Sequence, residues 1–193
     1  MLYDDEIRKA MGVVMARFTD AVRTVQPGQW DLPTPCDGWT VRDVVDHVVA
    51  GERFVVSVMS GAALARSVDA SVGLDLDDDD DVVRQLTAAA LKALDAFNQP
   101  LDQMVEHPVG SIPARLFMEY RIIDQLGHTW DIGQATGNAV YLDPTTVNLG
   151  LEIAHNERAT LERSANFATQ PGDAVETDNP VATLMRLMGR SAT

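Results

Sequence analysis

The sequence contains two places where an aspartate precedes a histidine by four residues: Asp43 with His47, and Asp124 with His128. On a helix, side chains four residues apart lie one above the other, so each pair could share a hydrogen bond or hold a single ion. The spacing by itself favours the simpler interpretation, a core histidine hydrogen-bonded to a nearby aspartate. The residues around the second pair make it more informative.

A helix predicted over residues 111–137 gathers its apolar side chains on one arc, which comprises Leu116, Phe117, Tyr120, Ile123, Gly127, Trp130 and Ala135. Asp124 and Asp131 fall in the middle of this arc, and His128 falls at its rim. A carboxylate that faces a core costs roughly several kcal/mol unless it is paired, strongly hydrogen-bonded or bound to a cation. Both aspartates therefore need a partner.

A helix predicted over residues 40–60, with Thr40 as its N-cap and Asp43 as an acidic residue in its first turn, supplies a further histidine, because His47 lies inside its apolar arc. Asp43 lies at the edge of that arc and is a candidate for the lining of the site. If the two helices face each other, His47, Asp124 and His128 form a site of two histidines and one carboxylate, with positions left for water or substrate. Such a donor set suits Zn²⁺, and also Ni²⁺ or Fe²⁺. Asp131 could orient a ligand from behind, through a hydrogen bond.

Two other interpretations of these residues stay open. In a bundle without metal, Asp124 would be buried and would need a cation such as Arg121 or Arg42 as its partner. A dinuclear centre of the carboxylate-bridged kind uses paired Glu-x-x-His motifs, and here Glu152 with His155 is the single match, so we rank it low.

The remaining candidates for chemistry are few. Cys36 lies shortly before the second helix, whose dipole could activate its thiol, but a packed loop thiol is the favoured interpretation. His107, in a loop beside Pro108, and His155 are expected to be structural or exposed to solvent.

Apolar residues at steps of three and four predict an all-α protein, most simply a four-helix bundle with additional C-terminal helices. The predicted helices cover residues 7–25, 40–60, 83–97, 111–137, 143–165 and 179–189. The first helix should stop near Pro27, and residues 29–38 should form a structured loop. The fourth should open with Ser111–Pro113 as its cap and first turn. Residues 67–81 are expected to be a polar connection whose last aspartate caps the next helix.

Composition limits the classes of function. The 193 residues include 15 Lys plus Arg and 29 Asp plus Glu, a net charge of -14, which argues against nucleic acid and anionic membranes as partners. Apolar stretches fall short of the roughly 18 residues that span a membrane. The acidic start does not resemble a signal peptide, and one cysteine forms no internal disulfide. We therefore expect one cytoplasmic domain over residues 1–193.

Three segments carry a resemblance to a known family: WDLPTPCDGWTVRDVVDHVVAGE, RIIDQLGHTWDIGQATG and the closing LMRLMGR. They resemble the metal-binding proteins related to the N-terminal domain of mycothiol-dependent maleylpyruvate isomerase, within the DinB superfamily. The resemblance implies a DinB-type four-helix bundle with a metal at one end. It places the ligands on His47, Asp124 and His128, with Trp39 and Trp130 packed beside the site.

The sequence departs from the isomerase in two respects. The isomerase uses Glu as its acidic ligand where this chain has Asp124, and it carries a second domain that helps to bind substrate and thiol, whereas this sequence ends at Thr193. The isomerase activity is therefore not assumed.

Two functions are consistent with these residues. The first is a metal-dependent enzyme that uses a low-molecular-weight thiol such as mycothiol for transferase or isomerase chemistry on a small molecule. The second is a non-catalytic module that binds a metal or a small ligand. A metal saturated by four protein groups would favour the second, because a catalytic metal keeps a position open. The sequence leaves the substrate and the oligomeric state undetermined, a homodimer included.

Overall fold

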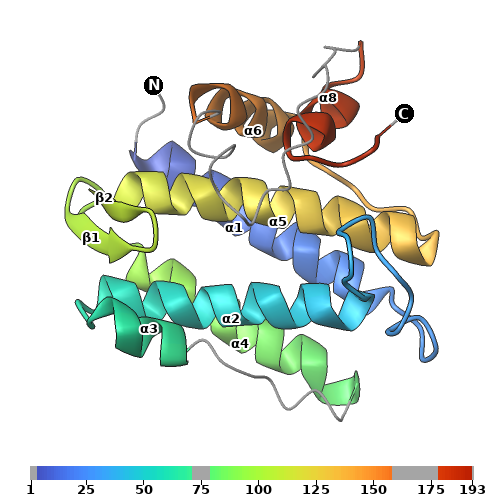
Figure 1. The fold of residues 1–193 in the computed structure, drawn as a ribbon, viewed down its shortest axis with the longest axis horizontal. Helices are drawn as coiled ribbons and strands as arrows, with labels where there is room; N and C mark the ends of the chain where they lie inside the picture. The colour runs from blue at the N-terminus through green and yellow to red at the C-terminus, as the bar shows by residue number, and fades with distance from the viewer. Residues whose placement is uncertain (1–3, 71–78, 158–177, 193) are drawn as a thin grey trace.

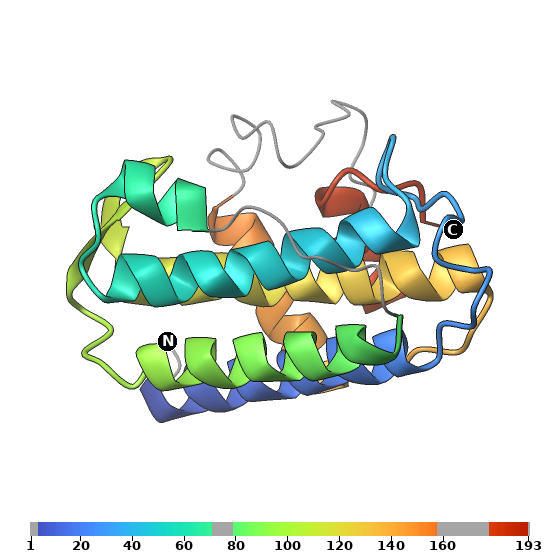
Figure 2. The same ribbon diagram turned by 90° about the horizontal axis from the view of Figure 1, so that it is seen from below.

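Four long helices lie side by side and pack around a common core (Figure 1). The computed structural model describes residues 4–70, 79–157 and 178–192. The bundle helices are α1 (Asp4–Arg23), α2 (Val41–Met59), α4 (Asp79–Ala96) and α5 (Ala114–Thr136). α1 and α2 each pack against both α4 and α5, and Figure 2 shows α1 and α4 side by side along one face. The predicted helical bundle is confirmed.

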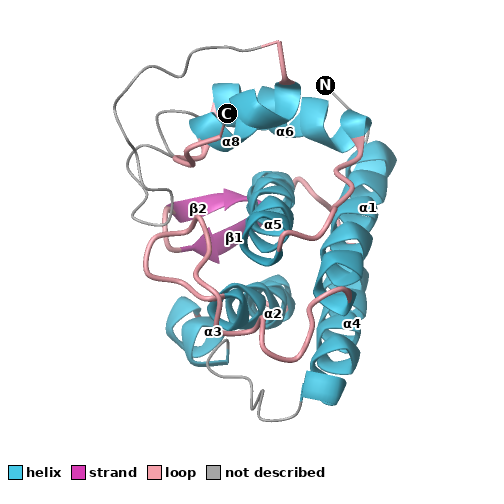
Figure 3. Cartoon of the chain, turned by 90° about the vertical axis from the view of Figure 1, so that its right-hand side faces the viewer, coloured by secondary structure: helices cyan, strands magenta, loops and turns pink. Residues whose placement is uncertain are grey.

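Shorter elements cover the outside of the bundle. They are α3 (Leu64–Ala70), α6 (Pro144–Asn156), α8 (Pro180–Leu187) and a hairpin of β1 (Met104–His107) and β2 (Gly110–Pro113). α3 packs against α2, α6 packs against α5, and α8 packs against α6. In Figure 3, α6 and α8 lie on the α5 side of the bundle, whereas α3 lies beside α2.

Within the described residues, the apolar core forms two clusters that meet at the interface of α2 and α5. On α2 the boundary between them lies between Val49 and Val55, and on α5 it lies between Leu126 and Ile132. Buried polar side chains, Glu52 among them, occupy this boundary. The core is therefore interrupted by charge at the place where α2 faces α5.

Local signals set several helix ends as predicted. α1 ends before Pro27, and α2 begins after Thr40, whose hydroxyl accepts a hydrogen bond from the Asp43 N–H in a reciprocal capping box. α5 ends at Thr136, and the next residue, Gly137, caps it in the left-handed conformation (φ 70°) that glycine tolerates.

The segment before α5 forms a hairpin, although the sequence predicted a helical first turn at Ser111–Pro113. Val105 pairs with Ile112 across the two strands, and both side chains are buried. Four-residue strands with one buried side chain each are too short to leave a recognisable alternation. α5 begins at Ala114, whose N–H group donates to the Gln103 carbonyl (2.8 Å) in place of a side-chain cap.

The connection predicted over residues 67–81 is also partly helical. Residues 67–70 end α3, which is held against α2 by a hydrogen bond from the Ser57 hydroxyl to Ser67 (3.0 Å). Asp81 does not cap α4 but lies in its first turn, where its carboxylate accepts a hydrogen bond from Gln85 (3.0 Å). Residues 71–78 lie outside the described part of the chain.

α6 is shorter than predicted. Asp143 caps its start as expected, by accepting a hydrogen bond from the Thr146 N–H (3.0 Å). The helix ends at Asn156 rather than near residue 165, and the Glu157 carboxylate accepts a hydrogen bond from the Tyr120 hydroxyl on α5 (3.0 Å). This contact depends on tertiary packing and leaves no periodic signal. Residues 158–165 lie outside the described range.

His107 lies in β1 rather than in a loop, and its ring packs among aromatic side chains. The ring centroids of Phe54, Phe117 and Tyr120 lie 5.9, 5.1 and 5.9 Å from that of His107. Burial, together with the nearby positive charge of Arg121, lowers the pKa of His107 to about 4. The imidazole is therefore neutral in the folded protein at neutral pH.

A buried neutral histidine makes stability depend on pH. Below pH 6.5 the unfolded chain binds a proton at His107 that the folded chain does not bind until about pH 4, so the stabilising contribution is complete above pH 6.5 and is lost toward pH 4. We expect His107→Phe to lose less unfolding free energy than the wild type between pH 7 and pH 4.5, measured by urea denaturation. Parallel losses in the two proteins would contradict this assignment.

Candidate metal centre

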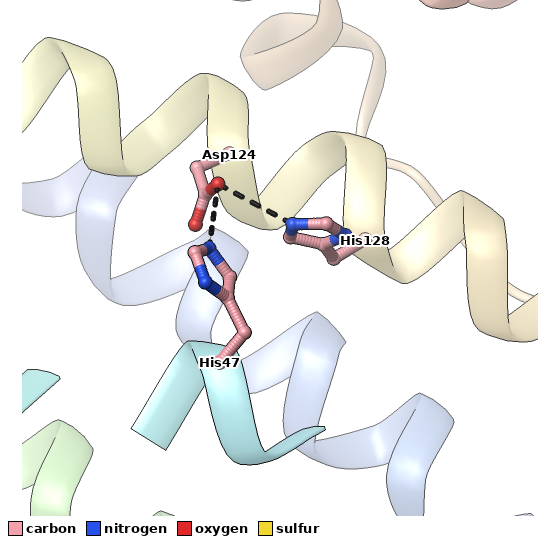
Figure 4. Close-up of side chains that lie close together, drawn as sticks. All are labelled: His47, Asp124 and His128. Carbon is pink, nitrogen blue, oxygen red and sulfur yellow. Dashed lines mark hydrogen bonds and ion pairs between the residues drawn. The ribbon is translucent and has the colours of Figure 1, made fainter. Parts of the chain in front are cut away.

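Three side chains from α2 and α5 converge at the interface of these helices (Figure 4). Asp124 Oδ1 lies 3.3 Å from His47 Nε2 and 3.4 Å from His128 Nε2. The three candidate ligand atoms all lie within 4.8 Å of one another. The structure thus brings together the three residues that the sequence singled out.

The loop before α2 places an aromatic ring on both histidines. It is held by hydrogen bonds from the Val41 N–H to the Leu32 carbonyl and from the Thr34 N–H to the Trp39 carbonyl. The Trp39 ring stacks on His128, with centroids 5.7 Å apart and planes 12° apart, and lies 4.9 Å from His47. Trp39 therefore lies beside the candidate site, as the resemblance implied.

Other predicted residues have different surroundings. Trp130 packs against the larger core cluster, the one that includes α6 and α8. Asp43 is exposed and caps α2, and hydrogen bonds from Thr40 lower the pKa of its carboxyl. Glu152 and His155 are exposed on α6, which agrees with their low ranking. We therefore assign Asp43 to the helix cap rather than to the pocket.

Arg121 partly neutralises Asp124. Its Nη1 donates to Asp124 Oδ2 (2.7 Å), while Oδ1 faces the two histidines. Burial would raise the pKa of Asp124, but the positive charges of His47, His128 and Arg121 hold it well below its usual range. Asp124 is thus a carboxylate with one oxygen paired and the other available as a ligand. Arg42, the other cation considered for this role, lies over the ring of Trp30 (5.2 Å).

Glu52 is a buried acid that our sequence analysis missed. Only 1% of its surface is exposed, and its Oε1 accepts hydrogen bonds from Arg121 Nη2 (2.9 Å) and from Gln125 Nε2. Burial raises the pKa of Glu52, although Arg121 opposes the shift. A signal was present, because Glu52 follows Val48 by four residues and precedes Val55 by three, which places it on the apolar arc of α2.

Asp131 is fully buried behind His128. Its Oδ2 lies 2.9 Å from His128 Nδ1, and Arg190 lies against both of its oxygens. Burial would raise the pKa of Asp131, but hydrogen bonds from His128 and Arg190 lower it. Asp131 therefore lies where it could orient His128, as predicted. Arg190 is the last residue of the LMRLMGR segment, but no sequence pattern linked it to Asp131.

The two spacings between Asp124 and the histidine nitrogens match those around a small divalent cation. Zinc binds imidazole nitrogen and carboxylate oxygen at about 2.0–2.2 Å, which separates neighbouring ligands in a tetrahedron by about 3.4 Å. The two contacts to Asp124 Oδ1, 3.3 and 3.4 Å, have this length. The ligand group found in the described part of the chain has three members, so a cation held there would keep coordination positions for water or substrate. Cys36, the other candidate for chemistry, lies in the loop before α2, and burial raises the pKa of its thiol.

A sequence model of the mycothiol maleylpyruvate isomerase N-terminal domain matches residues 12–133, which include all three candidate ligands. The chain belongs to this family. Two uncharacterized family relatives, from two strains of Mycobacterium tuberculosis, are each 32% identical over 129 residues. The match spans 66% of this chain and 65% of each relative, less than two thirds of their length.

Solved structures with the same fold are crystal structures of the mycothiol-dependent maleylpyruvate isomerase. A histidine-to-alanine mutant superposes with a TM-score of 0.57 and 12% identity, over 90% of this chain and 75% of that one. A second structure gives 0.55 and 14%, over 83% and 70%. These similarities show that the protein has the same helical fold. Within the described residues, no helix is both long and apolar enough to cross a membrane.

Gly51 makes room for the guanidinium that pairs with Asp124. A Cβ atom at this position would lie 2.5 Å from Cζ and 2.6 Å from Nη2 of Arg121. Because that guanidinium is buried and bonded to Glu52 and Asp124, it cannot move without losing these bonds. We expect Gly51→Ala to lower the unfolding free energy by about 1–3 kcal/mol, measured by urea denaturation.

Gly12→Ala is the matched control, because a Cβ there meets nothing within 4 Å and alanine favours the helix by up to about 1 kcal/mol. If Gly51→Ala were as stable as Gly12→Ala, the close packing of Arg121 on α2 would be refuted.

Proposed function

We propose that this family member is a cytoplasmic, metal-dependent enzyme that uses a low-molecular-weight thiol such as mycothiol for transferase or isomerase chemistry on a small molecule. The observation that carries the proposal is the convergence of His47 Nε2, Asp124 Oδ1 and His128 Nε2 in a group of three. Zinc is the preferred ion for two nitrogens and one oxygen, with Ni²⁺ or Fe²⁺ as alternatives.

A bound divalent cation would supply one property, the lowering of the thiol pKa that makes the thiolate available at neutral pH. The chain's own residues prepare the site. Arg121 holds Asp124 Oδ2, so that Oδ1 is the oxygen presented to the histidines. Asp131 accepts the Nδ1 proton of His128, which leaves the Nε2 lone pair for a ligand bond.

Access to the site is uneven. The His47 side chain is 33% exposed, whereas Asp124 is 15% and His128 is 5% exposed. A thiol and an electrophilic substrate would therefore approach from the His47 side, while Trp39 covers the histidine rings. Because the thiol supplies the nucleophile, the protein needs no reactive cysteine, in keeping with the raised pKa of Cys36.

The alternative is a module that binds a metal or a small ligand without catalysis. One observation favours it, since the ion pair between Arg121 and Asp124 already compensates this buried carboxylate in part. Among the described residues the ligand group has three members, which argues for catalysis, because structural zinc sites are closed by four protein ligands.

Metal analysis of a histidine variant tests the proposal. We expect protein stripped with a chelator and reloaded to bind one equivalent of zinc, and His47→Ala to lose most of it, because two ligands are too few for tight binding. The exposed His155→Ala is the control and should bind as the wild type does. Calorimetry and elemental analysis provide the readout.

The same preparations separate enzyme from binding module. Metal-dependent consumption of mycothiol with an electrophile would support catalysis, and zinc binding without thiol turnover would favour the module. Unchanged zinc in His47→Ala would overturn the proposed site itself.

A further inference from the structure

The segment that follows α8 reaches back to the candidate metal centre. Arg190 lies 62 residues after His128 and outside residues 12–133, which the family model covers. Its Nε donates to Asp131 Oδ1 (2.9 Å) and its Nη2 donates to Asp131 Oδ2 (2.6 Å). In Figure 1 this end of the chain lies over the C-terminal half of α5. Arg190 and Asp131 thus form a bidentate ion pair.

The surroundings fix Arg190 in this place. Its Nη1 donates to the Met188 carbonyl (3.1 Å), and its backbone N–H donates to the Met185 carbonyl (2.9 Å). On α5, a Cβ at Gly127 would lie 2.7 Å from Met188 Cε and 3.0 Å from Arg190 Cζ. The missing side chain at Gly127 therefore lets the C-terminal segment approach α5 closely.

Asp131 depends on this arginine because it is fully buried, with 0% of its surface exposed. An isolated buried carboxylate is strongly unfavourable, and Arg190 provides its compensating charge. Asp131 Oδ2 is shared between Arg190 Nη2 and His128 Nδ1. The ion pair therefore sets the position of the oxygen that holds the His128 ring.

We propose that Arg190 is a positioning residue of the metal centre, which acts through Asp131 to hold His128 with Nε2 aimed at the cation. This inference rests on the proposed function. Hydrogen-bond partners of metal-bound histidines fix the ring orientation and raise ligand basicity, and their loss costs about 10–100-fold in metal affinity. The C-terminal segment is thereby part of the site, although it supplies no ligand.

Zinc affinity of full-length variants tests this role. We expect Arg190→Gln to raise the Kd for Zn²⁺ about 10–100-fold, in competition with a chromophoric chelator. Arg190→Lys keeps the charge and should recover part of the loss. The control is Arg8→Gln, because Arg8 bonds the Phe97 and Gln99 carbonyls between α1 and the end of α4, so its removal should lower stability and leave the zinc Kd unchanged.

A double-mutant cycle distinguishes positioning from mere stabilisation. If Arg190 acts through Asp131, Arg190→Gln should add no further loss of zinc affinity to Asp131→Asn. In the cobalt-substituted protein, both variants should change the visible absorption of the metal in the same way, whereas Arg8→Gln should keep the wild-type spectrum.

The opposite results would overturn the inference. These are a wild-type zinc Kd in Arg190→Gln, or a loss that adds in full to that of Asp131→Asn. Should Arg190→Gln fail to fold by circular dichroism, Arg190→Lys decides by the same two criteria. Failure of the proposed function differs, because then the wild-type protein itself would bind no zinc, whatever the Arg190 variants do.

Discussion

The cost of burying carboxylates where α2 faces α5 is the constraint on which the site depends. Glu52, Asp124 and Asp131 lie within or at the edge of the bundle core, and each would be unfavourable there alone. Arginines compensate all three: Arg121 pairs with Glu52 and Asp124, and Arg190 pairs with Asp131. Close packing at two glycines accommodates these guanidinium groups. The compensation of charge thus explains why Gly51 on α2 and Gly127 on α5 lack a side chain beside these arginines.

This arrangement also orients the candidate ligand atoms. Because Arg121 takes Asp124 Oδ2, the remaining oxygen lies between two imidazole nitrogens, and because Asp131 holds His128 Nδ1, the opposite nitrogen faces that oxygen. The candidate site is therefore formed by α2 and α5, the loop that carries Trp39 and the segment after α8. The side that stays partly open is that of His47, where the proposed function would have a thiol and a substrate enter.

Sequence patterns predicted what is periodic or local. The apolar stripes located the long helices, and the capping box of Thr40 with Asp43 located the start of α2. Asp124 and Asp131 were identified because acids on an apolar arc conflict with burial. The hairpin before α5, the end of α6 and the ion pair of Arg190 with Asp131 could not be read from the sequence, since each depends on contacts between distant segments. Glu52 could have been found by the same argument as Asp124.

The most direct test of the account is the position of the metal in crystals of zinc-loaded protein, located by anomalous scattering. The account predicts one zinc ion within about 2.0–2.2 Å of His47 Nε2, His128 Nε2 and one Asp124 oxygen, with a fourth position held by solvent or by an added thiol. Zinc bound elsewhere, or enclosed at this place by a fourth protein side chain, would contradict it.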